Sequence, residues 1–139
     1  MMRIEEAEMR FGIHVPRQST LPATALYAAD VGCQTIQLFS GNPMSWTTGG
    51  LDERDGAFPM EEIERARIAP VFLHTPYLIN LATPVRRLQT NSLRGLVAAM
   101  VRAHELNAGP VVVHCGNHMG EGAEAGIERA IRMVERALK

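Results

Sequence analysis

The sequence predicts an α/β fold of four strand–helix units whose strands lie parallel in one sheet. Two observations lead to this prediction. Short apolar segments alternate four times with segments of helical periodicity, and the third and fourth apolar segments lack polar alternation. Uninterrupted apolar runs are typical of strands that helices cover on both faces. Crossovers between parallel strands are right-handed, so all four carboxyl ends lie at one rim, where we expect the functional site.

The first two units are delimited by proline, glycine and charge. Pro16 ends the first strand because it cannot continue a central ladder, and Pro22 stands at a first-turn position, where a helix tolerates proline. Gly32 ends that helix, and the next helix carries acids early and arginines late, which matches a helix dipole. The predicted segments are a strand at 10–15, a helix at 22–31, a strand at Thr35–Phe39, a polar loop at 46–59 and a helix at 60–69.

The last two units contain the clearest helical periodicity. Asn91 or Ser92 can cap a helix whose apolar residues recur at spacings of three and four until residues 107–109 end it. The predicted segments are a strand at Val71–His74, a helix from 91 or 92 to about 106, a strand at 111–114, and a helix with an apolar stripe of Ile127, Ile131, Val134 and Leu138 that continues to Lys139.

Composition and charge indicate one globular domain of 139 residues, with 46% hydrophobic and 21% charged residues. A net charge of -1 gives no general electrostatic preference for nucleic acid, although a local basic patch stays compatible with it. The first ten residues have no apolar signal-peptide region, so we expect a cytoplasmic protein with no membrane span. Cys33 and Cys115 are far apart in sequence and are expected to be free thiols.

Three of the five histidines, His14, His74 and His114, end predicted strands. They are expected to converge at the rim, and neutral imidazole is a common metal ligand, so the sequence predicts a histidine-rich metal site there. The alternative is that each is an ordinary hydrogen-bonded rim residue. His118, in a glycine-rich turn, can orient a ligand, contact a phosphate or face solvent, whereas His104 is expected to be an ordinary helix residue.

Four segments resemble a known family. Residues 74–82 read HTPYLINLA, and GIHV at 12–15, QLFSGNPMSW at 37–46 and VVHCGNH at 112–118 match further family segments in the same order along the chain. This pattern resembles the endonuclease IV group of apurinic/apyrimidinic endonucleases, within the xylose isomerase-like TIM barrel superfamily. The resemblance implies that residues 1–139 form the N-terminal half of a TIM (β/α)8 barrel. It also implies a trinuclear zinc site and hydrolysis of the phosphodiester on the 5′ side of abasic sites in DNA.

The resemblance assigns roles to individual residues. It implies that His74 and His114 are zinc ligands that share one ion, and that His14 supports them without binding the metal. Tyr77 matches an aromatic residue that family members press into DNA near the lesion, and the alternative is a tyrosine that packs under a loop. Asn42 and Trp46 match the DNA-facing loop after the second strand, where Trp46 can instead anchor the loop in the core. Of up to three Zn²⁺ ions in the complete family site, this chain would hold at most a partial site, with abasic DNA as partner.

The sequence also departs from the family. A full barrel takes roughly 250 residues, and the remaining ligands would come from strands five to eight. Met44 stands where the family often has arginine, and residues 16–22 replace a serine and paired glycines. Two alternatives therefore stay open: a metal-dependent sugar isomerase or epimerase of the same superfamily, and a non-catalytic half-barrel that dimerises through its open sheet edges. Arg86 and Arg87 can meet a phosphate or be an ordinary solvated pair.

Overall fold

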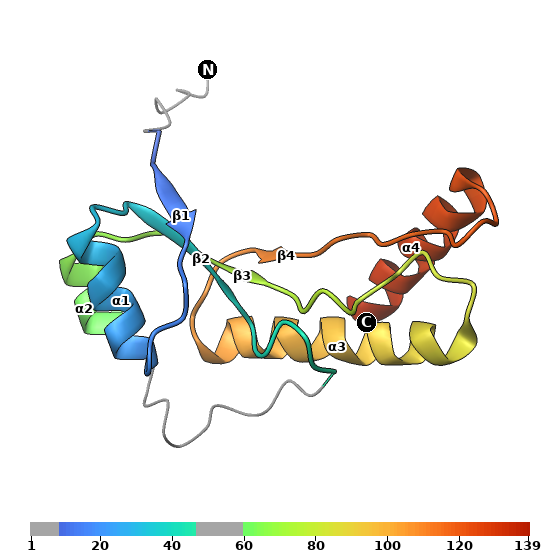
Figure 1. The fold of residues 1–139 in the computed structure, drawn as a ribbon, viewed down its shortest axis with the longest axis horizontal. Helices are drawn as coiled ribbons and strands as arrows, with labels where there is room; N and C mark the ends of the chain where they lie inside the picture. The colour runs from blue at the N-terminus through green and yellow to red at the C-terminus, as the bar shows by residue number, and fades with distance from the viewer. Residues whose placement is uncertain (1–8, 47–59) are drawn as a thin grey trace.

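The computed structural model describes residues 9–46 and 60–139, and in them it shows a four-stranded parallel sheet with strand order β1-β2-β3-β4 (Figure 1). The predicted α/β class with four strand–helix units is confirmed. Most of the polar loop predicted at 46–59 lies outside the described residues. The elements in order are β1 (Gly12–His14), α1 (Leu21–Asp30), β2 (Thr35–Phe39), α2 (Met60–Arg65), β3 (Val71–His74), α3 (Arg86–Glu105), β4 (Val111–Val112) and α4 (Ala123–Ala137).

The first half of the chain follows its local sequence signals closely. Thr20 caps α1, since its Oγ1 accepts a hydrogen bond of 3.2 Å from the Ala23 amide. Pro22 occupies the first turn, where no intrahelical donor is lost. Thr35–Phe39 is a strand with the predicted bounds, whereas β1 is shorter than predicted and α2 ends at Arg65, before residue 69.

The predicted start of α3 at Asn91 or Ser92 is wrong, because the helix begins at Arg86. Ser92 does not cap the helix: it is fully buried, and its Oγ accepts the Asn80 amide at 3.0 Å. The Gln89 amide instead donates to the Val85 carbonyl at 3.0 Å, which extends the helix by more than a turn toward its start. The Ser92 side chain, which the sequence pattern suggested as a helix cap, therefore binds the loop after β3.

The second half of the chain differs from the sequence prediction in two further respects. β4 ends at Val112, so His114 lies two residues beyond the strand and does not form its last position. The apolar stripe predicted on α4 does not form its buried face, since Ile127 and Ile131 are 60% and 53% exposed. α4 buries Gly126, Ala130 and Met133 instead. Small residues there allow close packing, and a Cβ added to Gly126 would approach the His118 Cβ to 2.8 Å.

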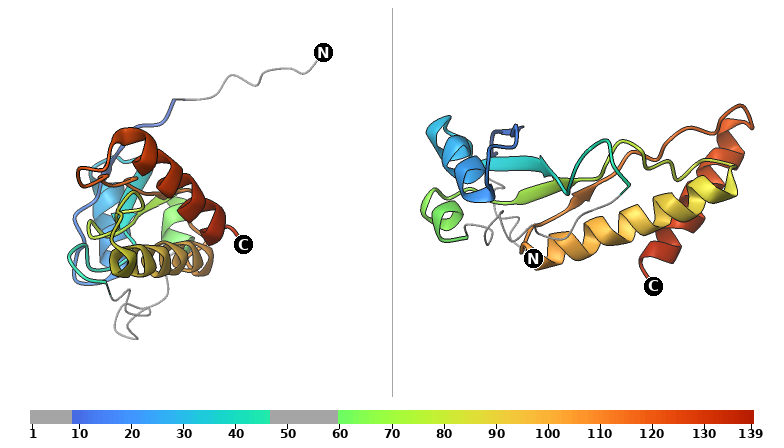
Figure 2. Two further views of the ribbon diagram at one scale, coloured as in Figure 1. Left: turned by 90° about the vertical axis from the view of Figure 1, so that its right-hand side faces the viewer. Right: turned by 60° about the horizontal axis from the view of Figure 1, so that its bottom comes forward.

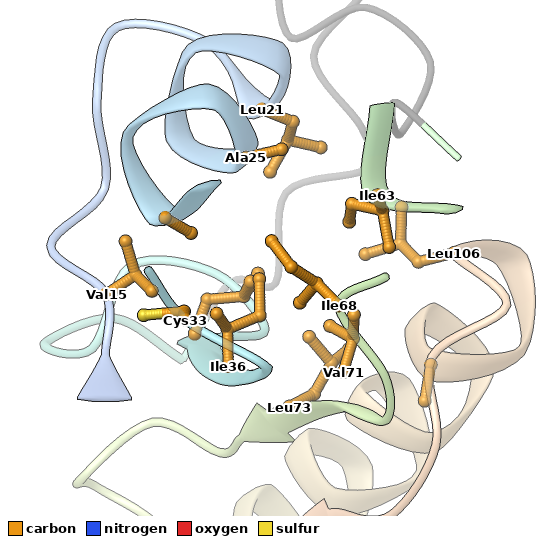
Figure 3. Packing of buried hydrophobic residues seen from close by; sticks show 13 residues of the cluster. Val15, Leu21, Ala25, Cys33, Ile36, Ile63, Ile68, Val71, Leu73 and Leu106 are labelled. Atoms are coloured by element: carbon orange, nitrogen blue, oxygen red, sulfur yellow. The ribbon is translucent and has the colours of Figure 1, made fainter. Parts of the chain in front are cut away.

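Two hydrophobic clusters form the core. α1 and α2 lie at one end of the molecule and α4 lies at the other, with the long helix α3 between them (Figure 2). The first cluster, which we call the sheet cluster, packs the sheet against α1, α2 and the end of α3 (Figure 3). The second, the helix-pair cluster, joins α3, α4 and the segment after β3, and its buried members are Ile79, Leu81, Leu96, Ala130 and Met133.

Cys33 is buried and Cys115 exposed, and both are free, as predicted. Within the described residues, none of the helices is both long and apolar enough to cross a membrane.

Candidate functional site

The strand ends bring together the three histidines that the sequence singles out. The ring centroids of His14 and His74 are 5.8 Å apart, and those of His74 and His114 are 5.0 Å apart. The parallel register accounts for this, because His14 pairs with Gln37 of β2 while His74 pairs with Phe39 of the same strand. Three imidazoles from distant parts of the sequence therefore share one rim.

Hydrogen bonds orient two of these rings. The His74 Nδ1–H donates to the Thr75 carbonyl at 2.7 Å, so its Nε2 keeps a free lone pair. The Gln37 Nε2–H donates to His14 Nδ1 at 2.8 Å, which places the proton of that neutral ring on Nε2. His74 is buried, whereas His114 is exposed. His74 thus keeps one defined nitrogen free to act as a ligand, and His114 stays accessible.

Burial lowers the pKa of His14, and the neighbouring His74 imidazole lowers this pKa further. Both effects disfavour a positive charge at a position next to another ionisable ring. The folded protein therefore favours the neutral form of His14, which can accept the hydrogen bond from Gln37.

Phe39 and Tyr77 complete an aromatic cluster around the imidazoles. Phe39 lies 4.4 Å from His14 and 5.3 Å from His74, measured between ring centroids. Tyr77 lies 5.9 Å from His74 and 6.5 Å from His114, yet it is 58% exposed. Tyr77 is therefore not packed beneath a loop, and its ring is available at the mouth of the site. Sequence reasoning did not single out Phe39, although its alternation with Gln37 along β2 predicts that both face the same side.

Asn42 lies in the loop after β2, next to this cluster. Its side-chain oxygen accepts the Met44 amide at 2.9 Å, which closes a tight turn. The Tyr77 amide donates to the Pro43 carbonyl at 3.0 Å, so the loops after β2 and β3 are joined beside the histidines. Met44 is exposed, and Trp46 is partly exposed at the end of the described segment.

Asn80 ties the loop after β3 to the loop after β4. Its Oδ1 accepts the amides of Ala82 and Asn117, and its Nδ2 donates to the Asn117 carbonyl at 3.0 Å. Gly116 has a φ of 94° and packs directly on Asn80, where any side chain would collide. These residues keep His114 beside His74. Sequence reasoning missed them, although Asn80 belongs to the HTPYLINLA segment.

His118 is half-buried and has a structural task in the loop after β4. Its Nδ1 accepts the amides of Gly120 and Gly122 at 3.2 and 3.1 Å. Gly122 is the N-cap residue of α4 and makes no side-chain cap bond, so the His118 ring supplies an acceptor next to the helix start. His104, on α3, is exposed and lies near the end of that helix.

The chemistry of the pair His74 and His114 fits a metal ion. Zn–N bonds are about 2.0–2.1 Å long, and two neutral imidazoles with centroids 5.0 Å apart can reach one ion. The hydrogen bond from His74 Nδ1 to a carbonyl is the usual support for a metal-binding histidine. Within the described ranges, however, no group of three or more His, Cys, Asp or Glu residues converges on a common point.

Comparison with known proteins agrees with this architecture. Residues 25–139 match the family model described as the xylose isomerase-like TIM barrel. The chain is 37% identical over 131 residues to a probable endonuclease 4 of Natranaerobius thermophilus, covering 94% of this chain and 46% of that protein. It is 36% identical over 129 residues to a probable endonuclease 4 of Methanoculleus marisnigri, covering 92% and 45%. The chain thus spans about half the length of these curated relatives.

The fold resembles the crystal structure of endonuclease IV from Thermus thermophilus, with a TM-score of 0.73 and 24% sequence identity. The match covers 94% of this chain and 48% of that one, which is consistent with part of a TIM barrel. The predicted resemblance to the endonuclease IV group is confirmed. On the family match, the chain belongs to the xylose isomerase-like TIM barrel family.

Proposed function

We propose that this chain is the N-terminal half-barrel domain of a metal-dependent endonuclease that hydrolyses DNA on the 5′ side of abasic sites. The observation that carries the proposal is the pair His74 and His114, whose rings are 5.0 Å apart beside the exposed ring of Tyr77. The similarity to proteins named probable endonuclease 4 supports the same interpretation.

In this proposal His74 and His114 hold one Zn²⁺ ion through their ring nitrogens. A bound zinc ion supplies hydroxide near neutral pH and stabilises the charge of a phosphoryl transition state. Thr75 orients His74 through its carbonyl. Burial and the neighbouring His74 ring lower the pKa of His14, so its neutral form is favoured beside the proposed ligands, and Gln37 donates a hydrogen bond to it. Two histidines supply half of a tetrahedral coordination sphere.

Tyr77 and Asn42 are the proposed DNA contacts. The Tyr77 ring is exposed and lies against His114, where it can stack on a base or sugar next to the lesion. The Asn42 oxygen is occupied by Met44, which leaves its amide NH₂ to donate to a backbone phosphate. An abasic nucleotide leaves the stack at lower cost than a paired base, and this difference would supply lesion selectivity.

Metal binding is tested by equilibrium dialysis of the whole chain against Zn²⁺ and by titration with Co²⁺, which reports ligand type in its absorption spectrum. We expect His74→Gln and His114→Gln each to lower metal affinity by tenfold or more, since changing a residue that only supports a metal ligand already costs about 10–100-fold. His104→Gln, on an exposed position of α3, is the matched control and should leave affinity unchanged. Equal binding by all three variants would exclude these residues as ligands.

DNA recognition is tested by fluorescence anisotropy with duplexes that contain or lack a tetrahydrofuran abasic analogue. Tyr77→Ala should abolish preference for the abasic duplex, and Tyr27→Ala, on α1, should not. Cleavage is then assayed with the chain alone and with an added C-terminal half of an endonuclease IV relative. A metal-loaded assembly that ignores abasic DNA would refute the proposed substrate.

Self-association is a second proposal, favoured by the strand order. β1 and β4 are the outer strands of the sheet, and Phe11 and Ile13 beside or within β1 are exposed. Unpaired edges of this kind accept another strand readily. We infer that two copies pair through these edges. Sedimentation should show a dimer that Ile13→Lys converts to monomer, while Val97→Lys on α3 leaves it intact; a wild-type monomer at high concentration would rule the pairing out.

A further inference from the structure

A groove of about 270 Å³ lies between α3 and α4. Three arginines of α4 line it at positions i, i+3 and i+7, which places them on one face of the helix. Its complete lining is Gln89, Arg129, Arg132, Met133 and Arg136. None of these residues takes part in the site described above.

Arg129 is held in place by two partners at one end of the groove. Its Nε–H donates to the Ala82 carbonyl at 2.8 Å, and its Nη1 pairs with Glu121 at 2.9 Å. The side chain is only 14% exposed, and its second terminal nitrogen, Nη2, is buried with no hydrogen-bond partner. A cationic donor left unpaired in a buried position is unfavourable unless an acceptor reaches it.

The other two arginines are weakly neutralised. Arg132 pairs with Glu128 at 3.3 Å, and both side chains are more than half exposed, so solvent screens this pair. The Arg136 guanidinium approaches the Met133 sulfur at 4.0 Å, and no carboxylate of the described segments forms an ion pair with it. Arg132 and Arg136 are also one turn apart, where like charges repel. The groove therefore has an excess of positive charge.

We propose that this groove binds a phosphate group. Guanidinium groups present planar, forked donors that match phosphate oxygens, and three of them line one partly enclosed space here. The volume suits one phosphate with water. The pair of Arg129 with Glu121 also ties the groove to the loop after β4, which carries His114. Both a free phosphate and a backbone phosphate of DNA that extends past the rim have the required chemistry.

The direct test is isothermal titration of the full chain with inorganic phosphate, against chloride at equal ionic strength. The double variant Arg132→Gln/Arg136→Gln removes two exposed charges and leaves the anchoring Arg129 intact. Loss of charged hydrogen bonds should weaken phosphate binding about tenfold or more. Arg94→Gln, an exposed arginine of α3 outside the groove lining, is the matched control and should bind phosphate like the wild type.

A second arm identifies the source of the phosphate. Binding of an undamaged duplex is measured at several salt concentrations; if DNA is the ligand, the double variant should lower the slope of log K against log salt by about one to two units. If only inorganic phosphate binding changes, the groove serves a free phosphate. Absence of phosphate binding by a folded wild-type chain, or equal weakening by Arg94→Gln, would overturn the proposal.

Discussion

The sheet cluster and the helix-pair cluster differ in how completely they are covered. The sheet cluster is enclosed between the strands, α1, α2 and the end of α3, and Ile36, Ile68 and Leu73 in it are almost inaccessible to solvent. The helix-pair cluster has five buried members, and the apolar residues Ile127 and Ile131 of α4 stay exposed. The sheet cluster lies between the sheet and the helices that pack on it, whereas α4 is covered on one side only.

The residues of the candidate site are held in place in two different ways. His14 and His74 end strands that belong to the sheet side, and His74 is buried. His114 follows the short strand β4 and is held in place by the link between Asn80 and Asn117. One proposed ligand position therefore depends on core packing and the other on loop hydrogen bonds, so the two should respond differently to mutation.

The largest loss of unfolding free energy is expected from a change in the sheet cluster. Leu73→Ala removes a fully buried side chain from the central strand β3 and should cost about 3–5 kcal/mol of unfolding free energy. Leu96→Ala makes the same change in the helix-pair cluster, where the incomplete cover allows relaxation, and should cost about 2–3 kcal/mol. Urea denaturation measures both. Equal losses would mean that the two clusters are equally well packed.

The next largest loss of stability is expected where Asn80 joins the loop after β3 to the loop after β4. Gly116→Ala forces a side chain against Asn80 at a positive φ and should cost about 2–3 kcal/mol. Gly120→Ala introduces the same change at a φ of 91° where no atom lies within 4 Å. That control should lose about 1 kcal/mol from backbone strain alone. If both variants lose the same amount in urea denaturation, the contact with Asn80 does not stabilise the loop.

A smaller effect is expected at the start of α1. Thr20→Ala removes the hydroxyl that accepts the Ala23 amide and should cost about 1 kcal/mol. Thr20→Ser keeps the acceptor and should retain most of that stability. Thermal unfolding of the two variants separates the cap from the lost methyl group. A stable alanine variant would show that α1 depends on the sheet cluster alone.

The smallest effect should be on the open side of α4. Ile131→Ser alters an exposed residue and should change the unfolding free energy by less than about 0.5 kcal/mol. Met133→Ala, on the buried side of the same helix, should cost about 2–3 kcal/mol. A loss above about 1.5 kcal/mol for Ile131→Ser would indicate that another surface covers this face in solution.

Sequence patterns were reliable where the structure depends on local chemistry. The predicted bounds of β2 and β3 match the structure, because apolar β-branched runs and flanking turn formers act over a few residues. The patterns gave wrong predictions where a side chain interacts with residues distant in the sequence. Ser92 resembles a cap but bonds Asn80, and Ile127 resembles a core residue but faces outward. The polar loop predicted at 46–59 is largely untested, since residues 47–59 lie outside the described ranges.

The sequence by itself determined the four strand–helix units and the positions of His14, His74 and His114 near strand ends, because period and turn chemistry are local properties. Only the tertiary structure decided which imidazole nitrogen of His14 accepts the hydrogen bond from Gln37, which loops Asn80 joins, and which side of α4 is buried. The first two outcomes depend on partners 23 and 37 residues away, and the third on the packing of α4 against α3. No local sequence signal encodes them, because strand register and helix packing set the positions of the partners.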